Sequence, residues 1–265
     1  DPLANVDDGS CVPVIIGCMD DTYVEYNSAA TCDASPSLCA TACIHGCMDS
    51  TAFNYDANAT CSAIDSCAHA VGDYLQGGVV FYIANPPADL NGDGSLDFGL
   101  ICDIENIGPE LWGCATGIFQ NSFVGVDEDA IGTGFENTIT IVNSNCPNYH
   151  NWDTTTTNAA ELCYNRVSNG YNDWFLPSRD ELYEIYLNKN IINNTAIAHG
   201  GSSLDAGSAS WQSSFTDPVY WSSSESNNNS SSGWEYAYWL NFTTGDYNSA
   251  YLKRTECHVR AIRVF

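Results

Sequence analysis

A cysteine-bounded repeat fills the start of the chain, and it limits the possible fold more than any other feature. The motif Gly-Cys-Met-Asp begins at Gly17 and again at Gly46, and each copy continues through an aromatic-Asn element to Ala-Thr-Cys. The second Cys follows the first by fourteen residues in both copies, from Cys18 to Cys32 and from Cys47 to Cys61. Units this short bury too little apolar surface to fold alone, so they depend on cross-links and neighbouring copies.

The repeats divide the chain into four segments. Residues 1–16 read as the tail of a truncated copy, 17–45 and 46–67 as two acidic Cys-rich repeats, and 68–265 as one larger domain. The chain has no initiator Met. We therefore expect it to be part of a larger, processed and exported protein.

Cysteine usage indicates the compartment. Thirteen Cys are present, and eight of them lie in the first 67 residues, which favours an oxidising, extracellular setting. The spacing predicts disulfides Cys18–Cys32 and Cys47–Cys61. Cys11 then has its partner in the missing half-repeat, bonds a neighbouring chain, or is a free thiol.

The charge is very unevenly distributed. Residues 1–165 contain 23 Asp or Glu and no Lys or Arg, whereas residues 166–265 hold all seven basic residues and 10 acids. Such a surface repels nucleic acid and anionic membranes, and no apolar run is long enough to span a bilayer. It suits either carboxylates cross-linked by Ca²⁺ or simple solubility in a salt-rich medium.

The larger domain shows strand signals at both ends and few helix signals. Residues 77–83 predict a strand, with 99–102 as its antiparallel partner, and further strands are expected at 220–222, 236–242 and 258–265. One helix is expected within 154–165. A better one spans 178–188, where Ser178 and Glu181 have the spacing of a capping box.

Four motifs in order carry a family resemblance. They are Gly-Gly-Val-Val-Phe-Tyr at 77–82, Asp-Trp-Phe-Leu-Pro-Ser at 173–178, Tyr-Trp-Ser-Ser-Ser-Glu at 220–225 and Val-Arg-Ala-Ile-Arg at 259–263. Together they resemble the C-terminal domain family of Legionella collagen-like protein and the related Fibrobacter major paralogous domains. The resemblance implies an α+β, C-type-lectin-like fold, preceded here by small, mostly irregular disulfide-rich repeats. Those repeats resemble the acidic Cys repeats of marine bacterial surface proteins and, more loosely, thrombospondin type 3 repeats.

The resemblance also implies a disulfide pattern. C-type-lectin-like domains usually tie their first helix to their last strand, which here pairs Cys163 with Cys257. We further expect Cys102 to pair with Cys114, which leaves Cys146 for Cys67 or another repeat Cys.

One acidic loop has the spacing of a cation site. It places oxygen-bearing side chains at positions 1, 3, 5 and 9 of an EF-hand-like segment, with Gly94 at position 6. The predicted Ca²⁺ ligands are Asp89, Asn91, Asp93, Ser95 and Asp97. Position 12 is Leu100 rather than Glu, so Asp103 or a backbone carbonyl would have to complete the shell. The alternative is an acidic hairpin turn.

Aromatic residues near the Ser/Asn-rich segment 222–232 suggest a ligand platform. The Ca²⁺-binding triplets of sugar-binding C-type lectins are absent. The candidate ligand-binding residues are Trp234, Tyr236, Trp221 and Glu225, because aromatic faces stack on sugars. Burial in the core is the competing interpretation for the Trp residues.

Catalysis and glycosylation receive less support. The five His residues lack metal-ligand spacing and no Gly-x-Ser-x-Gly elbow occurs, so we expect no enzyme activity. Asn-x-Ser/Thr triplets permit glycosylation at Asn58, Asn193, Asn228, Asn229 and Asn241.

Two functions remain in competition. In the first, the chain is an exported structural subunit of an extracellular fibre, sheath or surface assembly, and it self-associates with the help of disulfides and Ca²⁺. In the second, it is a cell-surface adhesin whose lectin-like domain binds a glycan or a protein.

Overall fold

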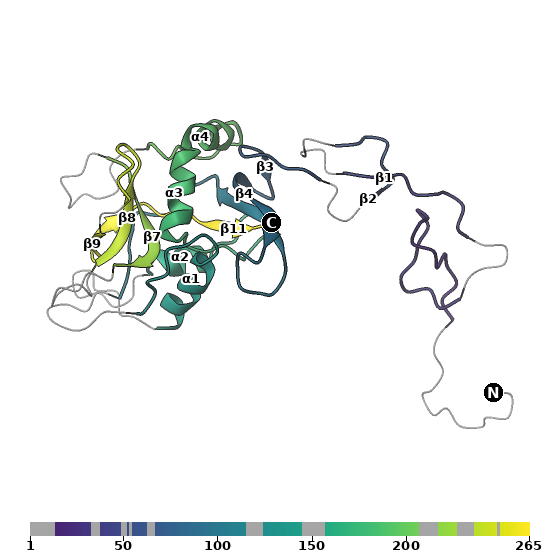
Figure 1. The fold of residues 1–265 in the computed structure, drawn as a ribbon, viewed down its shortest axis with the longest axis horizontal. Helices are drawn as coiled ribbons and strands as arrows, with labels where there is room; N and C mark the ends of the chain where they lie inside the picture. Colours follow the sequence, from purple (N-terminus) through teal and green to yellow (C-terminus); the bar gives the residue numbers. More distant parts are fainter. Residues whose placement is uncertain are drawn as a thin grey trace, which may run out of the picture. The chain divides into compact units, whose positions relative to one another are not determined.

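The computed structural model describes residues 14–32, 38–48, 52, 55–62, 67–114, 124–144, 157–206, 217–226, 236–247 and 250–265. The chain divides into two compact units, Asp1–Ala68 and His69–Phe265, drawn in Figure 1. In the described part of the first unit, regular structure is limited to two short parallel strands, β1 (His45–Gly46) and β2 (Cys61–Ser62). Within the ranges given above, no helix is both long and apolar enough to cross a membrane.

The two Cys repeats share one backbone hydrogen-bond pattern. Several bonds of the first copy recur in the second at the equivalent position. The pairs are Thr31 N–Ile15 O and Thr60 N–Ile44 O, both 2.9 Å, and Asn27 N–Cys18 O and Asp56 N–Cys47 O, both 2.9 Å. The glycine of the motif allows this close packing, because a Cβ on Gly17 or Gly46 would lie 3.1–3.2 Å from an Ala side chain. The sequence repeat is therefore also a structural repeat.

A linker, residues 38–43, runs back over the first repeat. Its backbone pairs with that repeat through Val24 N to Thr41 O at 2.9 Å and Cys43 N to Thr22 O at 2.8 Å. The Glu25 carboxylate accepts a further bond from Thr41 N at 3.0 Å. These bonds hold the linker in place between two disulfide positions.

The disulfides join Cys18 to Cys39, Cys43 to Cys61 and Cys47 to Cys67. The predicted pairs Cys18–Cys32 and Cys47–Cys61 are therefore wrong. The reason is the course of the linker, which brings Cys39 to the first repeat and Cys43 to the second. Spacing within one repeat could not reveal this, because each bond involves a Cys outside the fourteen-residue interval.

In the second unit, one sheet has the strand order β11-β5-β4-β3 and is antiparallel throughout. Its strands are β3 (Tyr74–Leu75), β4 (Gly78–Ala88), β5 (Asp97–Asp103) and β11 (Ile262–Val264). The predicted pairing of 77–83 with 99–102 is confirmed, with Val79 opposite Cys102. The expected terminal strand is shorter than 258–265, because residues 258–261 bond to loops and to other strands instead.

A second antiparallel sheet has the order β7-β8-β9, and a small ladder joins β6 to β10. The strands are β7 (Val219–Glu225), β8 (Tyr236–Asn241), β9 (Ala250–Leu252), β6 (Glu110–Leu111) and β10 (Glu256–Cys257). Every residue of β7 is buried. The Tyr-Trp-Ser-Ser-Ser-Glu motif is thus a core strand of this unit.

Four helices accompany the sheets: α1 (Gly134–Asn143), α2 (Ala159–Tyr164), α3 (Arg179–Leu187) and α4 (Lys189–Ala198). The capping box predicted at Ser178 and Glu181 is present, and Asn158 forms a second one at α2. Neither α1 nor α4 was predicted from the sequence. Both are rich in β-branched residues and Asn, which are poor helix formers, so tertiary packing decides their conformation.

Helix α3 lies between the two sheets (Figure 1) and contacts β4, β7 and β8. The buried apolar residues of the unit form two clusters. Trp112, Trp174 and Trp221 are fully buried in one, and Phe81, Phe175 and Phe242 in the other. The second unit therefore has a core of its own, which positions the polar groups described below.

Three cysteines of this unit are buried thiols. Cys102, Cys163 and Cys257 are free and fully enclosed, and burial raises the pKa of Cys102 to about 12. The predicted disulfides Cys163–Cys257 and Cys102–Cys114 are therefore wrong, because these thiols pack as small apolar side chains in the core. Cys114 is disulfide-bonded; Cys11 and Cys146 lie outside the described residues.

Candidate functional site

The predicted cation loop lies at the tip of the β4–β5 hairpin. The Asp89 carboxylate accepts bonds from Gly92 N at 2.7 Å and Gly94 N at 2.9 Å, and Asp93 accepts one from Ser95 N at 2.7 Å. Gly92 and Gly94 have φ values of 78° and 86°, which glycine adopts without strain. The backbone N–H groups of the loop thus point towards the carboxylates of Asp89 and Asp93.

Asp97 is the buried member of this loop, with 6 % of its surface exposed. Its Oδ2 accepts a bond from Leu90 N at 2.8 Å. Burial raises the pKa of Asp97, and repulsion from Asp93 and Asp89 raises it further. A cation in the loop would relieve this repulsion, so the donor set fits a hard, oxygen-seeking ion.

The rest of the expected shell does not assemble. Leu100 is fully buried in β5, and Asp103 is bonded to Arg166 Nε at 2.7 Å. Asp103 is therefore not available to complete the loop. Among the described residues no group of three or more His, Cys, Asp and Glu side chains forms a preformed metal cluster. A cation here would need amide, hydroxyl or carbonyl oxygens in addition to the carboxylates.

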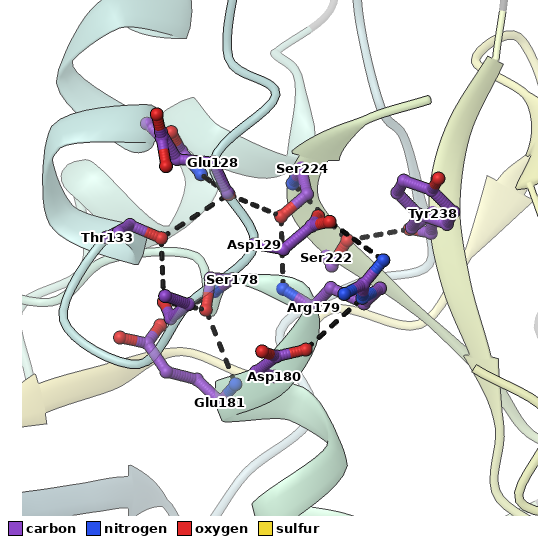
Figure 2. A network of polar contacts seen from close by, with 12 residues as sticks. Glu128, Asp129, Thr133, Ser178, Arg179, Asp180, Glu181, Ser222, Ser224 and Tyr238 are labelled. Atoms are coloured by element: carbon purple, nitrogen blue, oxygen red, sulfur yellow. Dashed lines mark hydrogen bonds and ion pairs between the residues drawn. The ribbon is translucent and has the colours of Figure 1, made fainter. Parts of the chain in front are cut away.

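A second polar network joins the segment before α1, the start of α3 and strand β7 (Figure 2). Arg179 bonds Asp129 at 2.7 Å and Asp180 at 3.2 Å, while its backbone N–H donates to Ser224 Oγ at 3.1 Å. Ser224 Oγ in turn donates to Glu128 O at 2.9 Å. These bonds tie the three segments together, although Oδ1 of Asp129 is buried without a hydrogen bond.

Glu181 is the fully buried carboxyl of this network. It accepts bonds from Ser178 N at 2.7 Å and Gly132 N at 2.8 Å. Burial raises the pKa of Glu181 to about 7, and these bonds hold it from rising further. Gly134 passes so close that a Cβ there would lie 2.2 Å from Oε2 of Glu181. The group fixes the loop before α1 to the start of α3.

The residues predicted to bind a ligand are mostly interior. Trp221 is fully buried, and its Nε1 donates to Glu110 O at 3.1 Å. Glu225 is buried beside Lys253, whereas Tyr236 is half-buried and Trp234 lies outside the described residues. The binding role predicted for Trp221 and Glu225 does not suit these positions, because neither side chain reaches solvent.

The sequons differ in accessibility. Asn58 is exposed, but Asn193 is buried, and its Nδ2 donates to Asp205 at 2.7 Å. Glycosylation at Asn193 is therefore incompatible with the folded unit. Asn241 is partly buried and its Nδ2 donates to Asp217 at 3.0 Å. Asn228 and Asn229 lie outside the described residues.

Sequence reasoning missed Lys253, which is completely buried. Its ammonium lies over the ring of Trp112 at 4.5 Å and contacts Glu225. The one available signal was scarcity, because the chain has only two lysines, Lys189 and Lys253.

Comparison with known proteins agrees with the motifs. Residues 134–263 match the family model described as the Lcl C-terminal domain. No curated protein matches the chain. The family match and the disulfides are compatible with an extracellular cell-surface protein. Three of the four motifs lie within the matched range, which confirms that the C-terminal part of this chain resembles the Lcl C-terminal domain family.

Proposed function

We propose that the protein is a structural subunit of an extracellular assembly, in which the Cys repeats form a cross-linked connector and the second unit a non-catalytic module. The observation that carries the proposal is the linker 38–43. Cys39 bonds it to the first repeat and Cys43 bonds it to the second. Load applied along the chain would therefore pass through disulfides as well as through the backbone.

The composition of the repeat unit supports the same role. Its apolar side chains stay largely outside, with Met19 and Met48 each 50 % exposed. Folding by burial contributes little here, whereas each disulfide that closes a loop of about twenty residues contributes about 3 kcal/mol. A connector built on covalent links keeps its shape without a core.

A non-catalytic role for the second unit is part of the proposal. Two buried ion pairs support it: Glu225 with Lys253, and Asp103 with Arg166. Ion pairs of this kind hold the charged groups in fixed positions, which suits a structural role. We further propose a C-type-lectin-like arrangement for this unit, supported by its two sheets with helices around them.

Ca²⁺ is proposed as a structural ion at the Asp89–Asp97 loop. The support is the raised pKa of the buried Asp97 beside Asp93 and Asp89. One bound ion would offset this repulsion, and at a concentration a hundredfold above its Kd it would stabilise the unit by about 2.7 kcal/mol.

The test is negative-stain microscopy of the protein with Ca²⁺, with excess chelator, and with a reductant. Ordered filaments or sheets that loosen on reduction support the structural subunit. Loosening on chelation that Asp93→Asn reproduces, and the exposed control Asp246→Asn does not, supports the ion. Discrete particles under every condition would falsify the assembly proposal.

A second function, adhesion, rests on one observation. Half-buried tyrosines form a row with a cation: Arg179 lies over Tyr238 at 5.1 Å and Tyr247 at 5.9 Å, and Tyr247 stacks on Tyr183 at 4.2 Å. Partly exposed aromatic rings of this kind suit sugar rings. A glycan array that compares the wild type, Tyr183→Ala and the exposed control Tyr164→Ala tests this function. Adhesion is supported if the wild type and Tyr164→Ala bind a glycan and Tyr183→Ala does not.

A further inference from the structure

Lys253 and Glu225 form a pair that is sealed from solvent. Lys253 follows β9, Glu225 ends β7, and their side chains are 0 % and 1 % exposed. Nζ of Lys253 contacts Oε1 of Glu225. One of the two lysines in the chain thus lies in the interior, against a carboxyl group.

Backbone N–H groups surround the other side of the carboxyl. Val124 N lies 3.0 Å from Oε1 and 2.9 Å from Oε2, and Gly125 N lies 2.9 Å from Oε2. Val126 N approaches Oε2 at 3.4 Å. The carboxyl therefore has the amine on Oε1 and three N–H groups around Oε2, of which Val124 N also reaches Oε1.

Trp112 closes the site on the amine side. Its ring lies 4.5 Å from Nζ, and its Nε1 donates to Ser222 O at 2.7 Å, which fixes the ring plane. Trp112 N also donates to Lys253 O at 3.0 Å, so ring and lysine backbone are held together. The amine is restricted to the vicinity of one carboxyl.

We propose that this pair condenses into an intramolecular amide cross-link between Lys253 Nζ and Glu225 Cδ. A buried ion pair has to offset the desolvation of two charges and often contributes no net stability. An amide removes both charges while it keeps the two side chains in place. The cross-link ties the end of β7 to the segment after β9, on the two flanks of β8.

The step balances without a co-reactant. A proton first passes from the Lys253 ammonium to Oε1 of Glu225, which it contacts. The neutral Nζ then attacks Cδ, a new N–C bond forms, and the bond from Cδ to Oε1 breaks. The ammonium brings three protons: one remains on the amide nitrogen and two leave with Oε1 as water. Charge is zero on both sides, because an ammonium and a carboxylate become a neutral amide and water.

The geometry favours this reaction in three ways. Fixed proximity supplies an effective concentration of about 10⁵–10⁸ M for well-oriented groups. The N–H groups of Val124 and Gly125 are placed to stabilise negative charge on Oε2 in the tetrahedral intermediate. Exclusion of water by Trp112 and the surrounding core favours the amide over its hydrolysis.

Intact-mass spectrometry of the full, folded chain tests the proposal, after reduction and alkylation of its cysteines. The expected mass is that of the sequence minus one water molecule. The control Lys189→Arg keeps this deficit, because its lysine is not part of the pair, and Lys253→Arg loses it. Glu225→Gln is expected to lose one ammonia instead, since the carboxamide nitrogen then leaves.

A proteolytic digest locates the bond. We expect one branched peptide containing both Lys253 and Glu225 in the wild type and in Lys189→Arg. A wild-type chain of full sequence mass overturns the proposal and leaves an ordinary ion pair, and so does a water deficit that persists in Lys253→Arg. The wild-type mass and the branched peptide of its digest can overturn the proposal even if the variants do not fold.

Discussion

The two units of this chain are stabilised by different interactions. Asp1–Ala68 holds ten of the 33 acidic residues and none of the seven basic ones, so the other 23 acids and all cations belong to His69–Phe265. The first unit is cross-linked by disulfides and leaves apolar side chains exposed. The second buries its apolar residues and holds its interior carboxyls by ion pairs, as at Glu225 and Asp103, or by backbone N–H groups, as at Glu181. The two units should therefore respond differently to a reductant and to a change of pH.

Reduction should produce the largest difference. We expect a reductant to unfold the repeats, because each lost disulfide removes about 3 kcal/mol from a unit without a substantial core. Most helices and sheets of the second unit should remain, since its core is apolar and Cys102, Cys163 and Cys257 are already thiols, although the disulfide of Cys114 is also reduced. Hydrogen exchange read along the chain measures both. Slow exchange in residues 14–62 after reduction would contradict the prediction that the repeats depend on their disulfides.

The cross-link pattern also predicts a pair of variants. Cys43→Ser with Cys61→Ser removes the bond between linker and second repeat, and should lower the stability of the repeats by about 3 kcal/mol. The second unit serves as the internal control. Its Trp fluorescence reports it alone, because all seven Trp follow residue 68.

Protonation of Glu181 should be the next largest effect, confined to the second unit. Its pKa is raised from 4.5 to about 7, so the folded state takes up the proton more readily than the unfolded state. This contribution is complete below pH 4.5 and is lost as the pH rises through 7, an overall change of about 3 kcal/mol. Urea titrations followed by Trp fluorescence at pH 5 and pH 8 measure it.

Glu181→Gln supplies the control for that measurement. The variant should be less stable at pH 5, because one amide cannot accept both N–H bonds, and its pH slope should be smaller. Asp129 and Glu184 keep part of the slope, since burial raises their pKa as well. An unchanged slope in the variant would assign the pH dependence to those other groups.

The repeats should respond to acid with the opposite sign. Hydrogen bonds from Thr41 lower the pKa of Glu25 from 4.5 to about 2. The contribution of Glu25 is present above pH 4.5 and is lost as the pH falls towards 2. Exchange of the Thr41 amide should therefore accelerate in that window. Glu25→Gln should accelerate it at neutral pH, and equal rates in both chains would contradict the role of this carboxylate.

The smallest predicted effect tests the equivalence of the repeats. Thr31 Oγ1 accepts from Ile15 N at 3.0 Å, and Thr60 Oγ1 from Ile44 N at 2.9 Å. Thr31→Val and Thr60→Val should each cost about 0.5–1 kcal/mol, because each removes one modest hydrogen bond. Thermal unfolding of the two variants side by side measures this. A clear inequality would show that one copy depends more on its neighbours.

Local signals predicted much of the second unit. The alternation of 77–83 gave β4, and the Ser178–Glu181 spacing gave α3 with its capping box. Helix α1 could not be predicted from the sequence, because residues 138–142 are all β-branched and favour strands. Its position is fixed by tertiary contacts, such as Thr138 Oγ1 donating to Leu176 O at 3.3 Å.

The disulfides and the site residues were harder to predict, for a physical reason. Disulfide partners depend on the path of the chain between repeats, which the spacing of Cys18 and Cys32 does not contain. In the same way, the sequence cannot tell whether Trp221 faces solvent or the core. The Asp89–Asp97 loop could be predicted, because its turn is built from neighbouring residues.

The overlap of two disulfides has a consequence for proteolysis. The loops closed by Cys43–Cys61 and Cys47–Cys67 overlap in sequence: Cys47 lies inside the first loop, and Cys61 lies inside the second. A protease that cuts a single peptide bond anywhere between Cys43 and Cys67 leaves both products joined through sulfur. The same holds between Cys18 and Cys39. Only the short stretch from Cys39 to Cys43, which is paired with Thr22 and Val24, offers a cut between Cys18 and Cys67 that these three disulfides do not bridge.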